Sequence, residues 1–347
     1  MTVTTQPAVI DFNRYPSVGT EDWRYAFASA RIRVLESLMI PRNTLVDMAN
    51  ADSFHAAADL LGGSEYALSG EADNASIEAM LLDRRRDVRS LWMQLMEDEP
   101  LIQVFRAQED FANMRLAIRR VVTERPLGLD YSDDGAVPAE EFEEIFEQEN
   151  YERLPEYLQE AVEAAVLGYY ENKDIRRIDY EIDRVEAAWR VRRACQLRKP
   201  FCIGLSRIQI DLNNLRTMFR LKMAERDDRQ FFLPDGYVET DRLVQGLDQG
   251  YDSLSALFFS TPYYEIVEEG VRYIKEQESF LKLERGCEDY LMGYLRTTRS
   301  ITAGYQPLIA YRLMKEAEIR TLRMILVGKK NGLAGQLILD RLGTWIA

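Results

Sequence analysis

The sequence predicts an all-α protein that consists of three copies of one helical bundle. The first observation is that apolar residues recur with a helical period along most of the chain, whereas the alternation typical of strands is scarce. The second is that one helical sequence motif occurs three times, and the third is that a shorter segment recurs with nearly the same period. A unit of about 100 residues is a typical domain size, so each copy is long enough to have its own core.

The repeated motif is an amphipathic helix with an arginine at the same position in each copy. Its copies read DFANMRLAIR (110–119), DLNNLRTMFR (211–220) and EIRTLRMILV (318–327). Alignment on Arg115, Arg216 and Arg323 gives intervals of 101 (216 − 115) and 107 (323 − 216) residues. The apolar residues also agree in position and form one continuous stripe on a helix, except that the third copy has Lys330 at the last of these positions.

The shorter segment precedes each of these helices in the sequence. Its copies read IPRNTL (40–45), VPAEEF (137–142) and VETDRL (238–243). Pro41 and Pro138 follow the first apolar residue, where proline suits the opening turn of a helix, and polar or acidic residues follow that favour a helix N-terminus. We therefore predict three short helices that begin at equivalent positions.

The remaining elements and the domain boundaries follow from proline-free helical stretches and from turn-rich ones. Long helices are predicted over 76–96, 174–197 and 273–295, and an opening helix over 20–39. Turn residues gather at 123–138 and 226–238. The predicted domains are therefore 1–130 (the first repeat with the N-terminal helix), 131–232 (the second repeat) and 233–347 (the third repeat).

The charge of the chain argues against nucleic acid and lipid as direct partners. It carries 58 acidic and 44 basic residues, a net charge of −14, which repels phosphate backbones and anionic headgroups. No apolar run approaches the roughly 20 residues of a membrane span, the N-terminus does not resemble a signal peptide, and three cysteines without metal-type spacing suit a reducing cytosol. Any membrane association is expected through protein partners.

No catalytic, cofactor-binding or metal-binding set of residues stands out. The single histidine, His55, is interpreted as a helix-face residue, because histidine catalysis and metal binding need oriented partners. The glutamates of 140–149 flank Phe142 and Phe146, as on a solvated helix face. The stretch VGKKNG (327–332) lacks the earlier glycine and the following Ser or Thr of a phosphate-binding loop. We predict no catalytic residue, no cofactor and no metal.

The repeated arginines and the asparagines near them allow two interpretations. In the first, Arg115, Arg216 and Arg323 pair with carboxylates of their own bundles, and Asn113 and Asn214 bond to a neighbouring loop. In the second, the three equivalent helices line a shared concave surface that binds a partner. The packing interpretation is favoured, because a repeat can recur for packing alone.

Several ordered stretches resemble the C subunit of prokaryotic A/V-type ATP synthases, a relative of the d subunit of vacuolar ATPases. They are PLIAYRLMKEAEIRTLRMILVGKKNGL (307–333), YAFASARIRVLESLMIPRNTLVDMANADSFHAAADLLGGSEY (25–66), FFLPDGYV (231–238) and STPY (260–263). The sequence departs from the family pattern in being more acidic around 139–160 and in lacking a threonine before Tyr66. The resemblance spans nearly the whole chain.

The resemblance implies a funnel of three helical domains on the cytoplasmic side of the membrane rotor ring. There it would serve as a non-catalytic socket between the central shaft and the proteolipid ring of a rotary ATPase. Glu316 and Glu318 lie in the most family-like stretch, so they join the three arginines as candidate partner-binding residues, and reversal of both charges is expected to weaken assembly. The alternative is a soluble helical-repeat scaffold or adaptor that binds some other protein.

Overall fold

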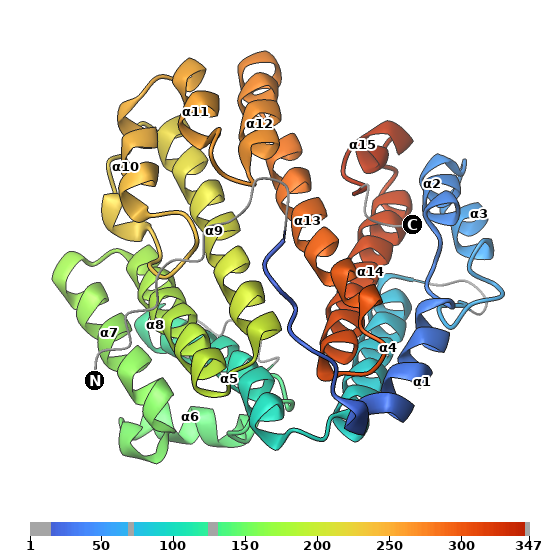
Figure 1. Ribbon diagram of the computed structural model, residues 1–347, viewed down its shortest axis with the longest axis horizontal. Helices are drawn as coiled ribbons and strands as arrows, with labels where there is room; N and C mark the ends of the chain where they lie inside the picture. Colours follow the sequence, from blue (N-terminus) through green and yellow to red (C-terminus); the bar gives the residue numbers. More distant parts are fainter. Residues whose placement is uncertain (1–14, 69–72, 124–130, 344–347) are drawn as a thin grey trace. The chain divides into compact units, whose positions relative to one another are not determined.

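The computed structural model describes residues 15–68, 73–123 and 131–343, and within these ranges all regular secondary structure is helical (Figure 1). The predicted all-α class is confirmed. The chain divides into two compact units, of which unit 1 covers residues 98–250 and unit 2 combines the described residues before 98 with those after 250. Unit 2 is thus built from both ends of the sequence.

Unit 1 contains four long helices, two short ones and two 3₁₀ turns. They are α5 (Glu99–Thr123), α6 (Ala139–Glu147), η2 (Tyr151–Arg153), α7 (Glu156–Asn172), α8 (Ile175–Gln196), α9 (Pro200–Met223), η3 (Arg229–Phe231) and α10 (Thr240–Asp248). Helix α8 packs against α5, α7 and α9. The core between these helices contains Phe111 of α5, Phe142 of α6 and Ile178 of α8, all fully buried. The repeated apolar stripe of α5 therefore faces this core, as its spacing predicts.

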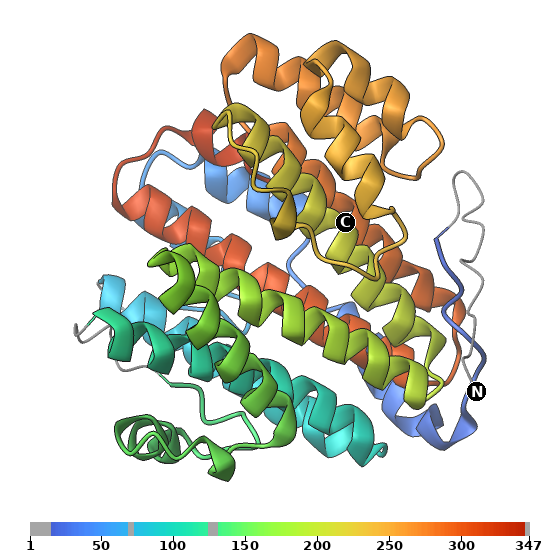
Figure 2. The same ribbon diagram turned by 90° about the vertical axis from the view of Figure 1, so that its left-hand side faces the viewer.

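Unit 2 contains the remaining helices. They are η1 (Trp23–Tyr25), α1 (Ala26–Glu36), α2 (Arg42–Asn50), α3 (Phe54–Asp59), α4 (Asn74–Leu95), α11 (Tyr251–Phe258), α12 (Tyr264–Gln277), α13 (Leu281–Arg296), η4 (Thr297–Ser300), α14 (Tyr305–Lys330) and α15 (Gly335–Leu339). The long red helix α14 runs beside α4 and also contacts α1, α2 and α13 (Figure 2). Most of its apolar side chains are buried, and Leu308, Leu322 and Ile325 are 0% exposed. Helix α14 is therefore the centre of the core of unit 2.

The three short helices predicted from the shorter repeated segment are present. They are α2, α6 and α10, which begin one or two residues after Pro41, Pro138 and Val238. Each places the predicted apolar residue in the core, because Leu45, Phe142 and Leu243 are all 0% exposed. The turn-rich stretch 226–238 contains only the 3₁₀ turn η3, whereas residues 124–130 of the other predicted boundary lie outside the described residues.

The helix predicted over 273–295 is wrong as a single element. Helix α12 ends at Gln277, and Glu278 adopts a left-handed conformation (φ 51°) before α13 begins at Leu281. The two helices pack on each other, and Gly270 lies so close to Leu283 that a Cβ on this glycine would be 3.2 Å from the leucine side chain. The left-handed conformation of Glu278 costs roughly 1–2 kcal/mol, and the packing between the two helices offsets this cost. No proline or glycine in the sequence marks the position of the break.

No helix in the described part of the chain combines the length and apolar character needed to cross a lipid bilayer.

Candidate functional site

The most distinctive local structure is a buried carboxylate that holds the loop before a short helix. Asp110 of α5 is 0% exposed and accepts a hydrogen bond from the backbone N–H of Val137 (3.0 Å) and one from the hydroxyl of Tyr157 (2.7 Å). One turn further on, Asn113 accepts from the N–H of Ser132 and donates to its carbonyl, both at 2.8 Å. We call a helix carboxylate bonded to the N–H of the residue two positions before a short helix a carboxylate clamp.

The second clamp lies on α9. Asp211 is 0% exposed and accepts hydrogen bonds from the N–H groups of Val238 (3.0 Å) and Tyr237 (3.1 Å). Asn214 accepts from the N–H of Leu233 (2.7 Å) and donates to its carbonyl (2.8 Å). In both clamps the carboxylate lies 27 positions before the residue whose N–H it binds, and the asparagine lies 19 positions before the residue that it bonds. The two sites therefore have the same construction.

The third clamp lies on α14 and connects the two ends of the sequence. Glu318 is 2% exposed and accepts hydrogen bonds from the N–H of Ile40 (2.7 Å) and the hydroxyl of Tyr66 (2.7 Å). Lys315, also buried, lies 2.5 Å from the Glu318 carboxylate and also pairs with Glu65. Ile40 opens the segment IPRNTL as Val137 opens VPAEEF, so Glu318 is the counterpart of Asp110 and Asp211.

A serine turn before Tyr66 replaces the threonine of the family pattern. The Ser64 hydroxyl donates to the carbonyl of Leu61 (2.8 Å) and accepts from the N–H of Tyr66 (3.1 Å). Thr261 of the STPY segment does the same with Phe258 (2.8 Å) and Tyr263 (3.3 Å). Ser64 before Tyr66 therefore forms the same two bonds as Thr261 of the STPY segment.

Burial dominates the electrostatics of the clamps. Loss of hydration raises the pKa of Asp110 above its usual range, although the hydrogen bonds from Tyr157 and Val137 act in the opposite direction. Burial, together with the nearby carboxylates, raises the pKa of Tyr157 and of Tyr66 well above the usual tyrosine value. These tyrosines therefore remain protonated donors, and the clamps hold loops in place without offering a reactive group.

Replacement of Asp110 by Asn should reveal the raised pKa as a pH dependence of stability. Because folded Asp110 binds a proton more readily than the unfolded chain does, the stability that it contributes is lost as pH rises from about 4 through its raised pKa. The difference in free energy of unfolding between wild type and Asp110→Asn should therefore decrease over this range in urea titrations. Asp133→Asn, an exposed change in the same loop, is the control, and a difference that grows with pH would contradict the assignment.

The three predicted arginines lie at the edges of the buried stripes. Arg115 pairs with Asp183, and its Nε lies 3.9 Å from Asp179, both on α8. Arg323 lies 2.6 Å from Glu78 of α4, with both side chains about half exposed, and Arg216 is half-buried on α9. Arg115 and Arg323 thus pair with carboxylates of the same compact unit, but Asp183 and Glu78 lie in other predicted repeats than the arginines they pair with. Asn113 and Asn214 bond to neighbouring loops, as the packing interpretation expects. Partner binding by the arginines stays a prediction.

The two predicted glutamates of α14 have internal partners. Glu316 lies 3.4 Å from Arg312 of the same helix and 3.5 Å from Arg89 of α4. Glu318 forms the third clamp, so its charge is turned toward Lys315 and away from solvent. The structural role of Glu318 was not predicted from the sequence, and its role in partner binding stays a prediction.

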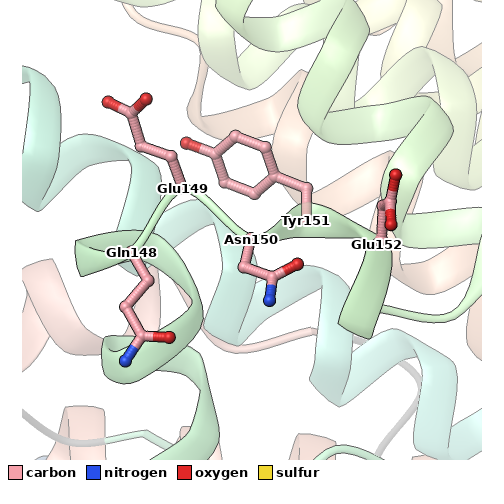
Figure 3. A pocket seen from close by; sticks show the side chains of 5 residues that line it. All are labelled: Gln148, Glu149, Asn150, Tyr151 and Glu152. Atoms are coloured by element: carbon pink, nitrogen blue, oxygen red, sulfur yellow. The ribbon is translucent and has the colours of Figure 1, made fainter.

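Two further places among the described residues, a surface hollow and His55, show no converging reactive side chains. A hollow of about 450 Å³ lies at the loop between α6 and η2, and its lining side chains do not converge, since Glu149, Tyr151 and Glu152 extend to one side of the loop and Gln148 and Asn150 to the other (Figure 3). His55 is exposed on α3, beside the Phe54 ring. In the part of the chain that the structure describes, no three His, Cys, Asp or Glu residues are grouped to hold a metal ion.

Comparison with known proteins gives relatives over nearly the whole chain. The C subunit of the V-type sodium ATPase of Enterococcus hirae is 22% identical over 90% of this chain and 95% of its own length. The C subunit of the V-type ATP synthase of Thermus thermophilus is 24% identical over 88% and 94%, and that of the A-type ATP synthase of Methanosarcina mazei is 22% identical over 92% of each chain. All three names denote one kind of subunit.

The family described as ATP synthase (C/AC39) subunit matches residues 28–341. This range contains all three copies of the repeated helix and all three clamps. With a match over so much of its length, the chain belongs to the ATP synthase C/AC39 subunit family.

Proposed function

We propose that this protein is a non-catalytic central-stalk subunit of a rotary V/A-type ATP synthase or ATPase. In this role it acts as a socket that couples the central shaft to the proteolipid ring of the membrane sector. It resides on the cytoplasmic side of the membrane and is held there by its protein partners. The observation that carries the proposal is the family match over residues 28–341, together with relatives that are named as C subunits and align over about nine tenths of both chains.

The clamps give this proposal a physical basis. A coupling element has to transmit torque, and a loop fixed by a buried carboxylate resists displacement because moving it would leave a buried charge unpaired. The same clamp occurs three times, at Asp110, Asp211 and Glu318, which supports three equivalent repeats. Three such repeats arranged as a funnel would give the shaft similar contacts on each side. The domain boundaries at 130/131 and 232/233 are part of this proposal.

The first test is extraction of native membranes with mild detergent, followed by affinity purification of the tagged chain. We expect the catalytic-head, shaft and ring subunits to co-purify in stoichiometric amounts. Recovery of the tagged chain in the soluble fraction, with none of these subunits, would overturn the proposal and favour a helical-repeat scaffold. Hydrolysis of ATP by the purified chain alone would contradict the non-catalytic role.

Three of the five candidate partner-binding residues can be tested in the same preparation. Reversal of charge at Glu316 and Glu318 is expected to lower recovery of the shaft and ring subunits. Because Glu318 is buried against Lys315, circular dichroism must first show that the variant remains folded. Charge reversal at the more exposed Arg323 tests partner binding with less effect on folding.

A further inference from the structure

The outer face of α1 is apolar and has no cover among the described residues of unit 2. Trp23 is 67% exposed, Phe27 75%, Val34 63% and Leu38 65%, and Ala30 is exposed between them. The opposite face of the same segment is also apolar, because Tyr25, Ala28 and Ile32 are buried against the unit. A helix that is apolar on both faces is normally covered on both. We call the five exposed residues the α1 seam.

The spacing of the α1 seam suits another helix. From Trp23 the steps are four, three, four and four residues, close to the alternation of four and three that lines up one side of a helix for packing against a second helix. Trp23 lies on the 3₁₀ turn that leads into α1, and Leu38 lies in the turn that follows it. The seam thus runs along the whole helix and does not end in a pocket.

The exposed charged residues within the seam segment (23–38) are both arginines. They are Arg24 and Arg31; Arg42 follows at the start of α2, and the exposed acids Glu21 and Asp47 lie before and after this segment. Arg24 pairs with Asp22, whereas Arg31 and Arg42 form no ion pair with a described residue. Arg33 and Glu36 of α1 pair with each other. A partner with carboxylates along its edge would complement the exposed arginines.

The same charges disfavour two other occupants of the seam. If a second copy of this chain packed its seam antiparallel to the first, the two Arg31 side chains would meet near the middle, because Arg31 lies halfway between Trp23 and Leu38. Like charges in such a position cost energy. An anionic membrane surface is bound by clusters of about four to eight basic residues, more than the seam offers, and it repels a chain of net charge −14.

We propose that the α1 seam is the docking surface for an amphipathic α-helix of another subunit of the rotary complex, with apolar residues facing the seam and carboxylates beside Arg31. This inference rests on the proposed function, since it takes the partner from that complex. It adds to the proposed function a particular surface, and it gives the chemistry of the helix that covers the surface.

Photocrosslinking in the assembled complex tests the proposal. The photoreactive residue p-benzoylphenylalanine is placed singly at position 27, at position 34 and, as a control, at position 82, where Leu82 of α4 is 42% exposed. We expect the adducts from positions 27 and 34 to lie on one helix of one partner subunit, about two turns apart, and the control to give no adduct with that helix. Adducts only with lipid, with a second copy or with this chain itself would overturn the proposal.

Substitutions provide an independent measurement. Phe27→Asp and Val34→Asp should each lower recovery of the complex on the tagged chain at least about tenfold, while Leu82→Asp retains it. Arg31→Glu should also weaken recovery and Arg31→Lys should not. If the wild-type chain co-purifies with shaft and ring but these variants do so equally well, the docking surface is wrong and the proposed function stands. If the wild-type chain brings down neither, the proposed function fails.

Discussion

Glu318→Gln is expected to lower the free energy of unfolding by about 3 kcal/mol, because it removes one partner of a buried ion pair. Lys315 and Glu318 are both 2% exposed and lie 2.5 Å apart, so Lys315 would keep its charge in the interior with only Glu65 to balance it. The substitution preserves the shape of the side chain but weakens the bonds from Ile40 and Tyr66. Urea denaturation followed by circular dichroism measures the loss.

Two further variants separate this effect from the loss of any charge. Glu78→Gln removes the ion pair with Arg323, whose two side chains are each 48% exposed, and should cost less than about 1 kcal/mol. Lys315→Met added to Glu318→Gln should recover part of the stability, since it removes the unbalanced cation. Equal costs for the Glu78 and Glu318 variants would show that the buried pair does not stabilise unit 2.

Gly236→Ala is expected to destabilise unit 1 by roughly 2–3 kcal/mol through overpacking and loss of charged hydrogen bonds. A Cβ on Gly236 would lie 2.2 Å from the Oδ1 atom of Asp211, the atom that accepts from the N–H of Val238. The Asp211 side chain is 0% exposed and cannot move toward water, so the second clamp would have to open. Thermal and urea unfolding of the purified chain give the change.

The control is a glycine of unit 1 that has space around it. A Cβ on Gly250 would meet no atom within 4 Å, and neither glycine has a positive φ. Gly250→Ala should therefore be neutral or stabilise by up to about 1 kcal/mol, as glycine replacements usually do. Gly135→Ala, at the same distance from Asp110, should behave like Gly236→Ala. Stability unchanged in both clamp variants would rule out tight contact at these glycines.

The elements of the fold were largely predictable because they depend on local patterns. The apolar stripes of α5, α9 and α14, and the short helices α2, α6 and α10, follow from spacing and from proline near an opening turn. The break between α12 and α13 was not predictable, because Glu278 adopts a left-handed conformation at a position that no glycine or proline marks in the sequence.

The clamps were only partly predictable from the repeats. Each copy of the repeated motif begins with an acidic residue, five positions before the shared arginine. These residues are Asp110, Asp211 and Glu318. An acidic residue at the same position in three amphipathic helices was the feature of the sequence that could have indicated the clamps. The bonding partner was not predictable, because the clamped loop follows the helix in two copies and lies near the N-terminus for the third.

The third clamp also determines when, during synthesis of the chain, unit 2 can complete its folding. Ile40 leaves the ribosome long before Glu318, and Lys329 of α14, which donates to the carbonyl of Ala51 at 2.7 Å, appears later still. At about 5–20 residues per second, translation takes roughly 10–45 s to proceed from residue 97 to residue 318. During that interval unit 1 can fold in the nascent chain. The apolar faces of α1 to α4 that pack on α14 remain uncovered until α14 has been made. The N-terminal part of unit 2 therefore completes its packing only after the last long helix of the chain has been made.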